Sequence, residues 1–138
     1  MPYSVLIPFD GSDGSVGAVE YALDRYPEAN LTAMYVVTPQ SYFGVFAANN
    51  HELPSFEESE KRAQDTLEEA ETIVTDAGRE LETVVEQGEV AKTIVEAAEE
   101  YDEVVIGSHR REGAARILLG SVAETVARRA SVPVTITR

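Results

Sequence analysis

The stretch from Gly107 to Ser121 has residue types and spacing that suit phosphate binding. It reads Gly-Ser-His-Arg-Arg-Glu-Gly-Ala-Ala-Arg-Ile-Leu-Leu-Gly-Ser. Glycines let the main chain approach a phosphate closely because they carry no Cβ. A helix that begins near Ser121 would direct free backbone N–H groups and the positive end of its dipole toward an anion. The spacing alone leaves two interpretations open, a phosphate-binding loop and an ordinary connection between a strand and a helix.

Two other features of the sequence bear on its chemistry, one near Ser121 and one near Asp10. The segment Ser121-Val-Ala-Glu124 matches the S-x-x-E capping box, which predicts that the Ser121 side chain caps a helix. Asp10, in Asp-Gly-Ser, could be a general base, a metal ligand or a turn former. Ser12 and Ser121 have no histidine at motif spacing, and His51 and His109 are interpreted as surface residues. We therefore predict no catalytic residue and no protein metal site.

Several binding motifs are missing from the sequence. There is no Gly-Lys-Ser or Gly-Lys-Thr, which excludes a Walker motif, and no G-x-G-x-x-G follows the first apolar run. The 138 residues contain no cysteine, which excludes disulfides, zinc–thiolate sites and thiol catalysis. Any nucleotide site must therefore be of another type.

The elements that would position these residues follow from hydrophobic periodicity. Apolar runs predict strands, and helical spacing of apolar residues predicts the segments between them. The expected strands are 3–9, 31–37, 81–86, 103–107 and 132–137, and the expected helices are 15–25, 56–77, 91–100 and 121–130. Residues 40–55 are expected to form a long loop. This alternation predicts an open α/β domain with a parallel sheet covered on both faces, in which ligands bind beyond the carboxyl ends of the strands.

The sequence resembles a single-domain universal stress protein over essentially its whole length. The resemblance is carried by Val5-Leu-Ile-Pro-Phe-Asp-Gly-Ser12, Met34-Tyr-Val-Val37, Leu118-Leu-Gly-Ser-Val-Ala-Glu124 and Val132-Pro-Val134. The family's nucleotide motif is Gly, two residues, Gly, nine residues, Gly, then Ser or Thr. Gly107 and Gly120-Ser121 match its ends, while Arg110 stands at the second glycine position. The resemblance implies one domain over 1–138, a Rossmann-like, doubly wound five-stranded sheet and the strand order 3-2-1-4-5.

The resemblance also implies a function and a set of site residues. It implies a stress-response regulator or sensor that binds ATP, accompanied by Mg²⁺ or Mn²⁺, with at most slow hydrolysis. Asp10 would face the ribose and adenine side, Val36 would contact adenine through its main chain, and Gly88 would lie beside the base. Gly107, Gly120, Ser121 and Val122 would line the phosphates. The expected binding site also includes Ser108 and Arg110.

Arg110 leaves two functions open. Its side chain could fill the phosphate space, or its guanidinium could bind the phosphates. The first outcome would make the protein a dimeric interaction module that does not bind nucleotides. An adenylating enzyme is a weaker alternative, because Phe9-Asp-Gly-Ser-Asp-Gly14 lacks the Ser-Gly-Gly-x-Asp-Ser loop of such enzymes.

The net charge of the sequence limits the classes of partner that the protein is expected to bind. The sequence has 25 acidic and 11 basic residues, a net charge of −14, and only Lys61 and Lys92 are lysines. Such an acidic, lysine-poor chain predicts a halophilic source and disfavours nucleic acid binding. No run of 18 apolar residues and no signal-type N-terminus occurs, so we expect a cytoplasmic protein with no membrane contact. Strand 132–137 is expected at a sheet edge, and the family resemblance implies a homodimer formed through it.

Overall fold

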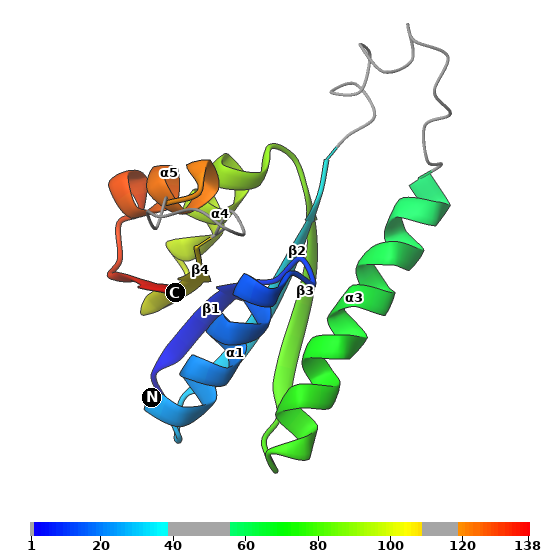
Figure 1. Ribbon diagram of the computed structural model, residues 1–138. Coiled ribbons are helices and arrows are strands. Elements are labelled where there is room, and N and C mark those ends of the chain that lie inside the picture. The colour runs from blue at the N-terminus through cyan, green and yellow to red at the C-terminus, as the bar shows by residue number, and fades with distance from the viewer. Residues whose placement is uncertain (1, 39–55, 109–118) are drawn as a thin grey trace, which may run out of the picture.

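The computed structural model describes residues 2–38, 56–108 and 119–138. Strands and helices alternate along these segments (Figure 1). The strands are β1 (Ser4–Pro8), β2 (Asn30–Val37), β3 (Leu81–Gln87), β4 (Glu103–Gly107) and β5 (Val134–Thr137). The helices are α1 (Asp13–Arg25), α3 (Phe56–Asp76), α4 (Val90–Ala98) and α5 (Ser121–Arg129). No helix in these segments is long and apolar enough to cross a membrane.

The five strands form one parallel sheet in the order β3-β2-β1-β4-β5, which confirms the predicted fold class and strand order. The central strand β1 pairs with β2 on one side and β4 on the other, so Val5 lies opposite both Leu31 and Glu103. The strand order reverses between β1 and β4. In open α/β sheets this reversal leaves a crevice beyond the carboxyl ends of the two strands.

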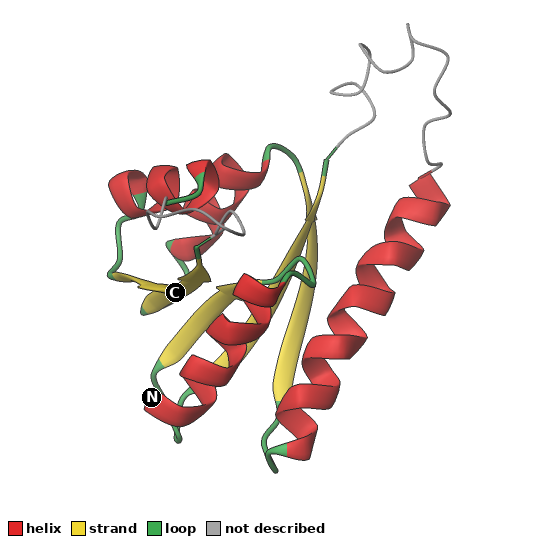
Figure 2. Cartoon of the chain, in the orientation of Figure 1, coloured by secondary structure: helices red, strands yellow, loops and turns green. Residues whose placement is uncertain are grey.

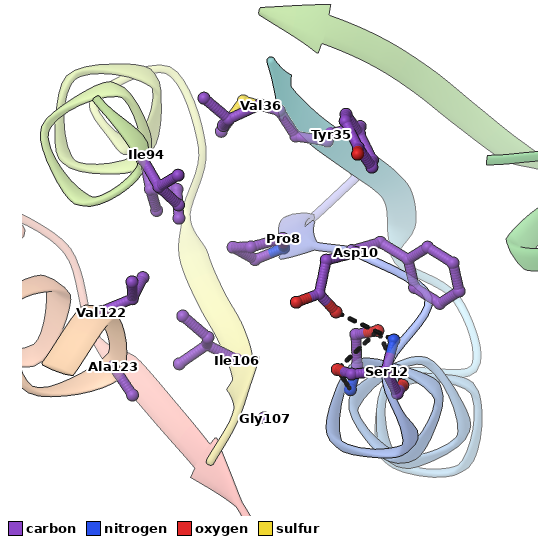
Figure 3. Close-up of a pocket in the computed structure, with 14 residues that line it drawn as sticks. Pro8, Asp10, Ser12, Tyr35, Val36, Ile94, Ile106, Gly107, Val122 and Ala123 are labelled. Atoms are coloured by element: carbon purple, nitrogen blue, oxygen red, sulfur yellow. Dashed lines mark hydrogen bonds between the residues drawn. The ribbon is translucent and has the colours of Figure 1, made fainter. Parts of the chain in front are cut away.

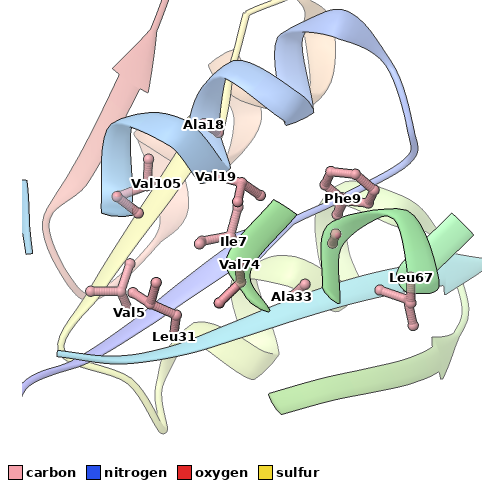
Figure 4. Packing of buried hydrophobic residues seen from close by; sticks show 12 residues of the cluster. Val5, Ile7, Phe9, Ala18, Val19, Leu31, Ala33, Leu67, Val74 and Val105 are labelled. Atoms are coloured by element: carbon pink, nitrogen blue, oxygen red, sulfur yellow. The ribbon is translucent and has the colours of Figure 1, made fainter. Parts of the chain in front are cut away.

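Helices cover both faces of the sheet (Figure 2). Helices α1 and α3 pack on one face over a core cluster that includes Ile7, Phe9 and Leu67 (Figure 4). Helices α4 and α5 pack on the other face, where Ile94 and Val126 belong to a second core cluster. Full burial of one such side chain contributes about 1.5–3 kcal/mol, so packing on both faces stabilises the sheet beneath the crevice.

Proline and glycine account for two element boundaries. Strand β5 begins at Val134, two residues later than predicted, because Pro133 has no N–H for the ladder. The Pro133 carbonyl still accepts a 3.0 Å hydrogen bond from the Val104 N–H. After α3, Gly78 has φ 77°, and the Arg79 N–H donates to the Val74 carbonyl at 3.0 Å. This arrangement ends α3 at Asp76, one residue before the predicted end of the helix at residue 77.

The start of α1 and the end of β4 approach each other backbone to backbone. A Cβ built on Gly107 would lie 2.2 Å from the carbonyl oxygen of Gly14. A Cβ on Gly14 would lie 3.0 Å from the carbonyl oxygen of Ser108. Glycine is therefore required at position 107 by the packing of α1.

A buried carboxylate at the amino end of β4 links four separate parts of the chain. Glu103, which is 7% exposed, accepts a 2.9 Å hydrogen bond from the Tyr3 hydroxyl. The hydroxyls of Tyr26 and Thr135 donate to its second oxygen, the latter at 2.7 Å. Hydroxyl donors thus stabilise a carboxylate that makes no ion pair with the described residues.

These bonds predict a loss of stability in alkali. The hydrogen bond to Glu103 raises the pKa of Tyr3 from its ordinary 10.0 to about 12, and burial followed by the same carboxylate raises the pKa of Tyr26. Because a raised folded-state pKa favours the neutral hydroxyl, this stabilisation is complete below pH 10 and is lost between pH 10 and about 12. Denaturant unfolding across this range should show a shallower decline for Tyr3→Phe than for wild type. Tyr21→Phe is the control, and parallel curves for wild type and Tyr3→Phe would contradict the prediction.

Candidate functional site

A cavity of about 230 Å³ lies at the carboxyl ends of β1 and β4, where the strand order reverses. Its walls come from the strands β1, β2 and β4, the helices α1, α4 and α5, and the β1–α1 turn (Figure 3). The lining residues used below are Asp10, Ser12, Val36, Ile94, Ile106, Gly107, Val122 and Ala123. The cavity lies where the sequence predicted ligand binding.

One wall of the cavity is apolar. Ile94 comes from α4, Ile106 from β4, and Val122 and Ala123 from the first turn of α5, and Figure 3 shows these side chains on the same side. Ile94 and Ala123 also belong to the core cluster under α4 and α5, so they are fixed by packing. Such a wall suits the flat face of an aromatic base.

The opposite wall is polar and is built by the turn between β1 and α1. Gly11 adopts φ 84°, and the Asp10 carboxylate accepts a 2.9 Å hydrogen bond from the Ser12 N–H. The Ser12 hydroxyl caps α1 by accepting a 3.2 Å hydrogen bond from the Ser15 N–H. Asp10 is therefore a turn former, as one interpretation held, and it also lines the cavity. Its carboxylate can accept hydrogen bonds from hydroxyl groups of a ligand.

The first turn of α5 differs from the sequence prediction. Ser121 is the first helical residue, Gly120 is the N-cap with φ −64° and ψ 152°, and no side chain caps the helix. The predicted capping box is therefore wrong. The Glu124 side chain instead pairs with Arg128 one turn later, and the Ser121 carbonyl accepts a 2.9 Å hydrogen bond from the Thr125 hydroxyl. Backbone N–H groups at the start of α5 are consequently left without side-chain acceptors from this box.

A second, more open hollow lies between the first turns of α4 and α5. Thr38, Glu89, Ala91, Ser121 and Thr125 line it. Val90 and Val122 line both this hollow and the cavity, so the two spaces adjoin. A ligand in the cavity can extend past Val122 toward the start of α5.

The structure brings several of the predicted site residues together. Asp10, Val36, Gly107 and Val122 line the cavity, and Ser121 lines the adjoining hollow. Gly120 directly precedes Ser121 and is the N-cap of α5. These positions come from the β1–α1 turn, β2, β4 and the start of α5, so the sheet topology is what brings them together.

Two predicted site residues, Ser108 and Gly88, contact other parts of the structure instead of the cavity. The Ser108 hydroxyl donates to the Thr137 carbonyl at 3.0 Å, so it is turned toward β5. Gly88 has φ 148°, and a Cβ there would lie 2.6 Å from the Thr93 hydroxyl oxygen. Neither residue lines the cavity as the described residues define it.

Some predictions fall outside the described residues. The predictions for Arg110, His51, His109 and the whole expected loop 40–55 fall in the segments 39–55 and 109–118, about which the structure makes no statement. Elsewhere in the chain, no group of three or more histidine or acidic side chains is arranged to hold a metal ion.

Sequence reasoning missed the apolar wall. Ile94 lies in the expected helix 91–100 and Ile106 in the expected strand 103–107, but apolar spacing in a helix or a short strand does not distinguish a core residue from a cavity wall. Their places at the carboxyl edge of the sheet were the available signal.

Comparison with known proteins gives one consistent family. The profile described as the Universal stress protein family matches residues 1–138. A universal stress protein of Methanocaldococcus jannaschii is 36% identical over 138 residues, covering 97% of this chain and 81% of that protein.

Solved structures of the same family share the architecture. A universal stress protein in complex with cAMP is 27% identical, covers 99% of this chain and 97% of its own, and superposes with a TM-score of 0.71. An Arabidopsis thaliana member with AMP bound covers 98% of this chain and 90% of its own, with a TM-score of 0.70. Its 16% identity makes it evidence for the fold alone.

Proposed function

Because this chain belongs to the universal stress protein family, we propose that it binds an adenine nucleotide in the cavity between β1 and β4. The observation that carries the proposal is the composition of the cavity walls. Ile106 and Val122 offer an apolar surface to the base, and Asp10 offers a hydrogen-bond acceptor to the ribose across from them. The related protein at 27% identity is a complex with cAMP, a ligand of this chemical class.

The size of the cavity indicates which part of a nucleotide it encloses. At about 230 Å³ it is below the roughly 300–1,000 Å³ typical of sites that hold a whole drug-sized ligand. The base and part of the ribose would fill it. The phosphates would then project into the hollow beside Ser121 and Val122, where the start of α5 favours an anion.

We further propose a regulatory or sensing role with at most slow hydrolysis. Among the described residues, Asp10 is the one carboxylate that lines the cavity, and its hydrogen bond to the Ser12 N–H employs it in the turn. ATP remains a candidate, and Asp10 is the cavity residue that could help hold Mg²⁺ or Mn²⁺ at its phosphates. The homodimer through β5 and the halophilic source also remain predictions.

A cavity-filling variant tests the proposal. Val122→Phe places a ring at the neck between cavity and hollow, and we expect AMP or cAMP affinity to fall at least about tenfold, because forcing extra atoms into a packed site costs roughly 1–3 kcal/mol. Val95→Phe is the matched control, because Val95 packs on the same core cluster but does not line the cavity. Affinity is measured by isothermal titration calorimetry, with folding checked by circular dichroism.

Two results would contradict the proposal. Equal affinities for Val122→Phe and wild type would place the ligand elsewhere. A wild-type protein that binds neither AMP, cAMP nor ATP would favour the interaction module suggested by Arg110 in the glycine motif.

A further inference from the structure

We infer that Glu89 makes this site select against nucleotides with many phosphate charges. The inference rests on the proposed function, because it concerns which adenine nucleotide the same site prefers. It assigns a specificity role to the N-cap residue of α4, the helix whose first turn faces α5 across the hollow.

The first step of the argument is the position of Glu89. It is the N-cap of α4, with φ −70° and ψ 131°, and its carbonyl accepts a 2.9 Å hydrogen bond from the Thr93 N–H. Its side chain makes no cap hydrogen bond. Glu89 lines the hollow together with Ser121 and Thr125. The carboxylate therefore borders the space into which phosphates would project.

The second step is the balance of charge around that space. Glu89 is exposed, and its side chain has no hydrogen-bond or ion-pair partner among the described residues. The described residues that line the cavity and the hollow include two acidic residues, Asp10 and Glu89, and neither lysine nor arginine. Among the described residues of these two linings, none carries a positive charge that would offset the negative charge of Glu89.

The third step is the dependence on ligand charge. Negative charge increases from adenosine through AMP to ATP, and each added charge is repelled by a carboxylate at the same border. The base and ribose contacts are common to all three ligands, so they do not alter this order. The site should thus favour lightly charged adenine ligands over ATP.

Neutralising Glu89 tests the inference. We expect Glu89→Gln at 0.1 M salt to raise ATP affinity about tenfold and AMP affinity about threefold, and to leave adenosine affinity unchanged. Glu96→Gln is the matched control, because it removes the same charge from an exposed position of the same helix that does not line the hollow. Calorimetric titrations of the three ligands with all three proteins give the comparison.

Salt dependence separates charge repulsion from a change of shape. In 1 M KCl the Debye length falls from about 10 Å to about 3 Å, so the gain from Glu89→Gln should largely disappear. Equal gains for all three ligands, no gain at all, or a gain that persists in 1 M KCl would overturn the inference while leaving nucleotide binding intact. Failure of wild type and both variants to bind any of the three ligands would overturn the proposed function as well.

Discussion

Replacing Gly107 by alanine is expected to lower the free energy of unfolding by about 3 kcal/mol, the upper part of the range for overpacking. The added Cβ would lie 2.2 Å from the carbonyl oxygen of Gly14, a distance that forces the backbone to move. Neither partner is a flexible side-chain end, so α1 must shift away from β4. Because typical domains have only about 5–15 kcal/mol of stability, the loss should be obvious in denaturant unfolding.

Gly17 provides a matched control within α1. A Cβ at Gly17 meets nothing within 4 Å, so Gly17→Ala should stabilise the protein by about 0.5–1 kcal/mol through helix propensity alone. Gly107→Ala and Gly17→Ala should therefore change stability in opposite directions. Unchanged stability of Gly107→Ala would show that α1 and β4 do not lie this close. Gly107 also matches the nucleotide motif. The measured change in the free energy of unfolding would therefore show how strongly packing alone requires glycine at this position.

Removing the Glu103 carboxylate is expected to cost about 3 kcal/mol, because each hydroxyl that loses a charged acceptor loses roughly 1.5–3 kcal/mol, offset in part by water. Tyr3, Tyr26 and Thr135 all donate to this carboxylate. Glu103→Ala should therefore be strongly destabilised, and Glu103→Gln less so, because its amide keeps an acceptor oxygen. Denaturant unfolding at pH 7 measures both.

A double-mutant cycle identifies the source of this loss. In a Tyr26→Phe background, Glu103→Ala should cost less than in wild type, because one of the bonds is already absent. Glu99→Ala, an exposed acidic residue four positions earlier, should change stability by no more than about 0.5 kcal/mol. Additive effects of Glu103→Ala and Tyr26→Phe would contradict the hydrogen-bonded cluster.

Local signals in the sequence predicted most of the fold. Strand 103–107 is a short apolar run, and its observed bounds agree with the prediction. Strand 132–137 was predicted too long, because hydrophobic pattern does not register that Pro133 lacks a backbone donor. Ser121 matched a capping pattern, but that pattern cannot reveal whether the serine lies before the first helical residue or within the helix.

The candidate site was less accessible to sequence reasoning than the fold. The family resemblance implied Asp10, Val36 and Val122, and all three line the cavity. It also implied Ser108, whose hydroxyl is committed to the Thr137 carbonyl, a contact between segments 29 residues apart. Such tertiary contacts, and the position of Glu89 at the hollow, depend on which helices face each other. That information is absent from spacing along the chain.

The position of β1 between β2 and β4 has a consequence for synthesis on the ribosome. The chain makes β1 first, but β4 ends only at Gly107, so one edge of the central strand stays unpaired during several seconds of translation at about 5–20 residues per second. An open apolar strand edge can pair with other nascent chains. The nascent chain is therefore most prone to misassembly before β4 has been synthesised. Pairing with β4 then covers this edge of β1.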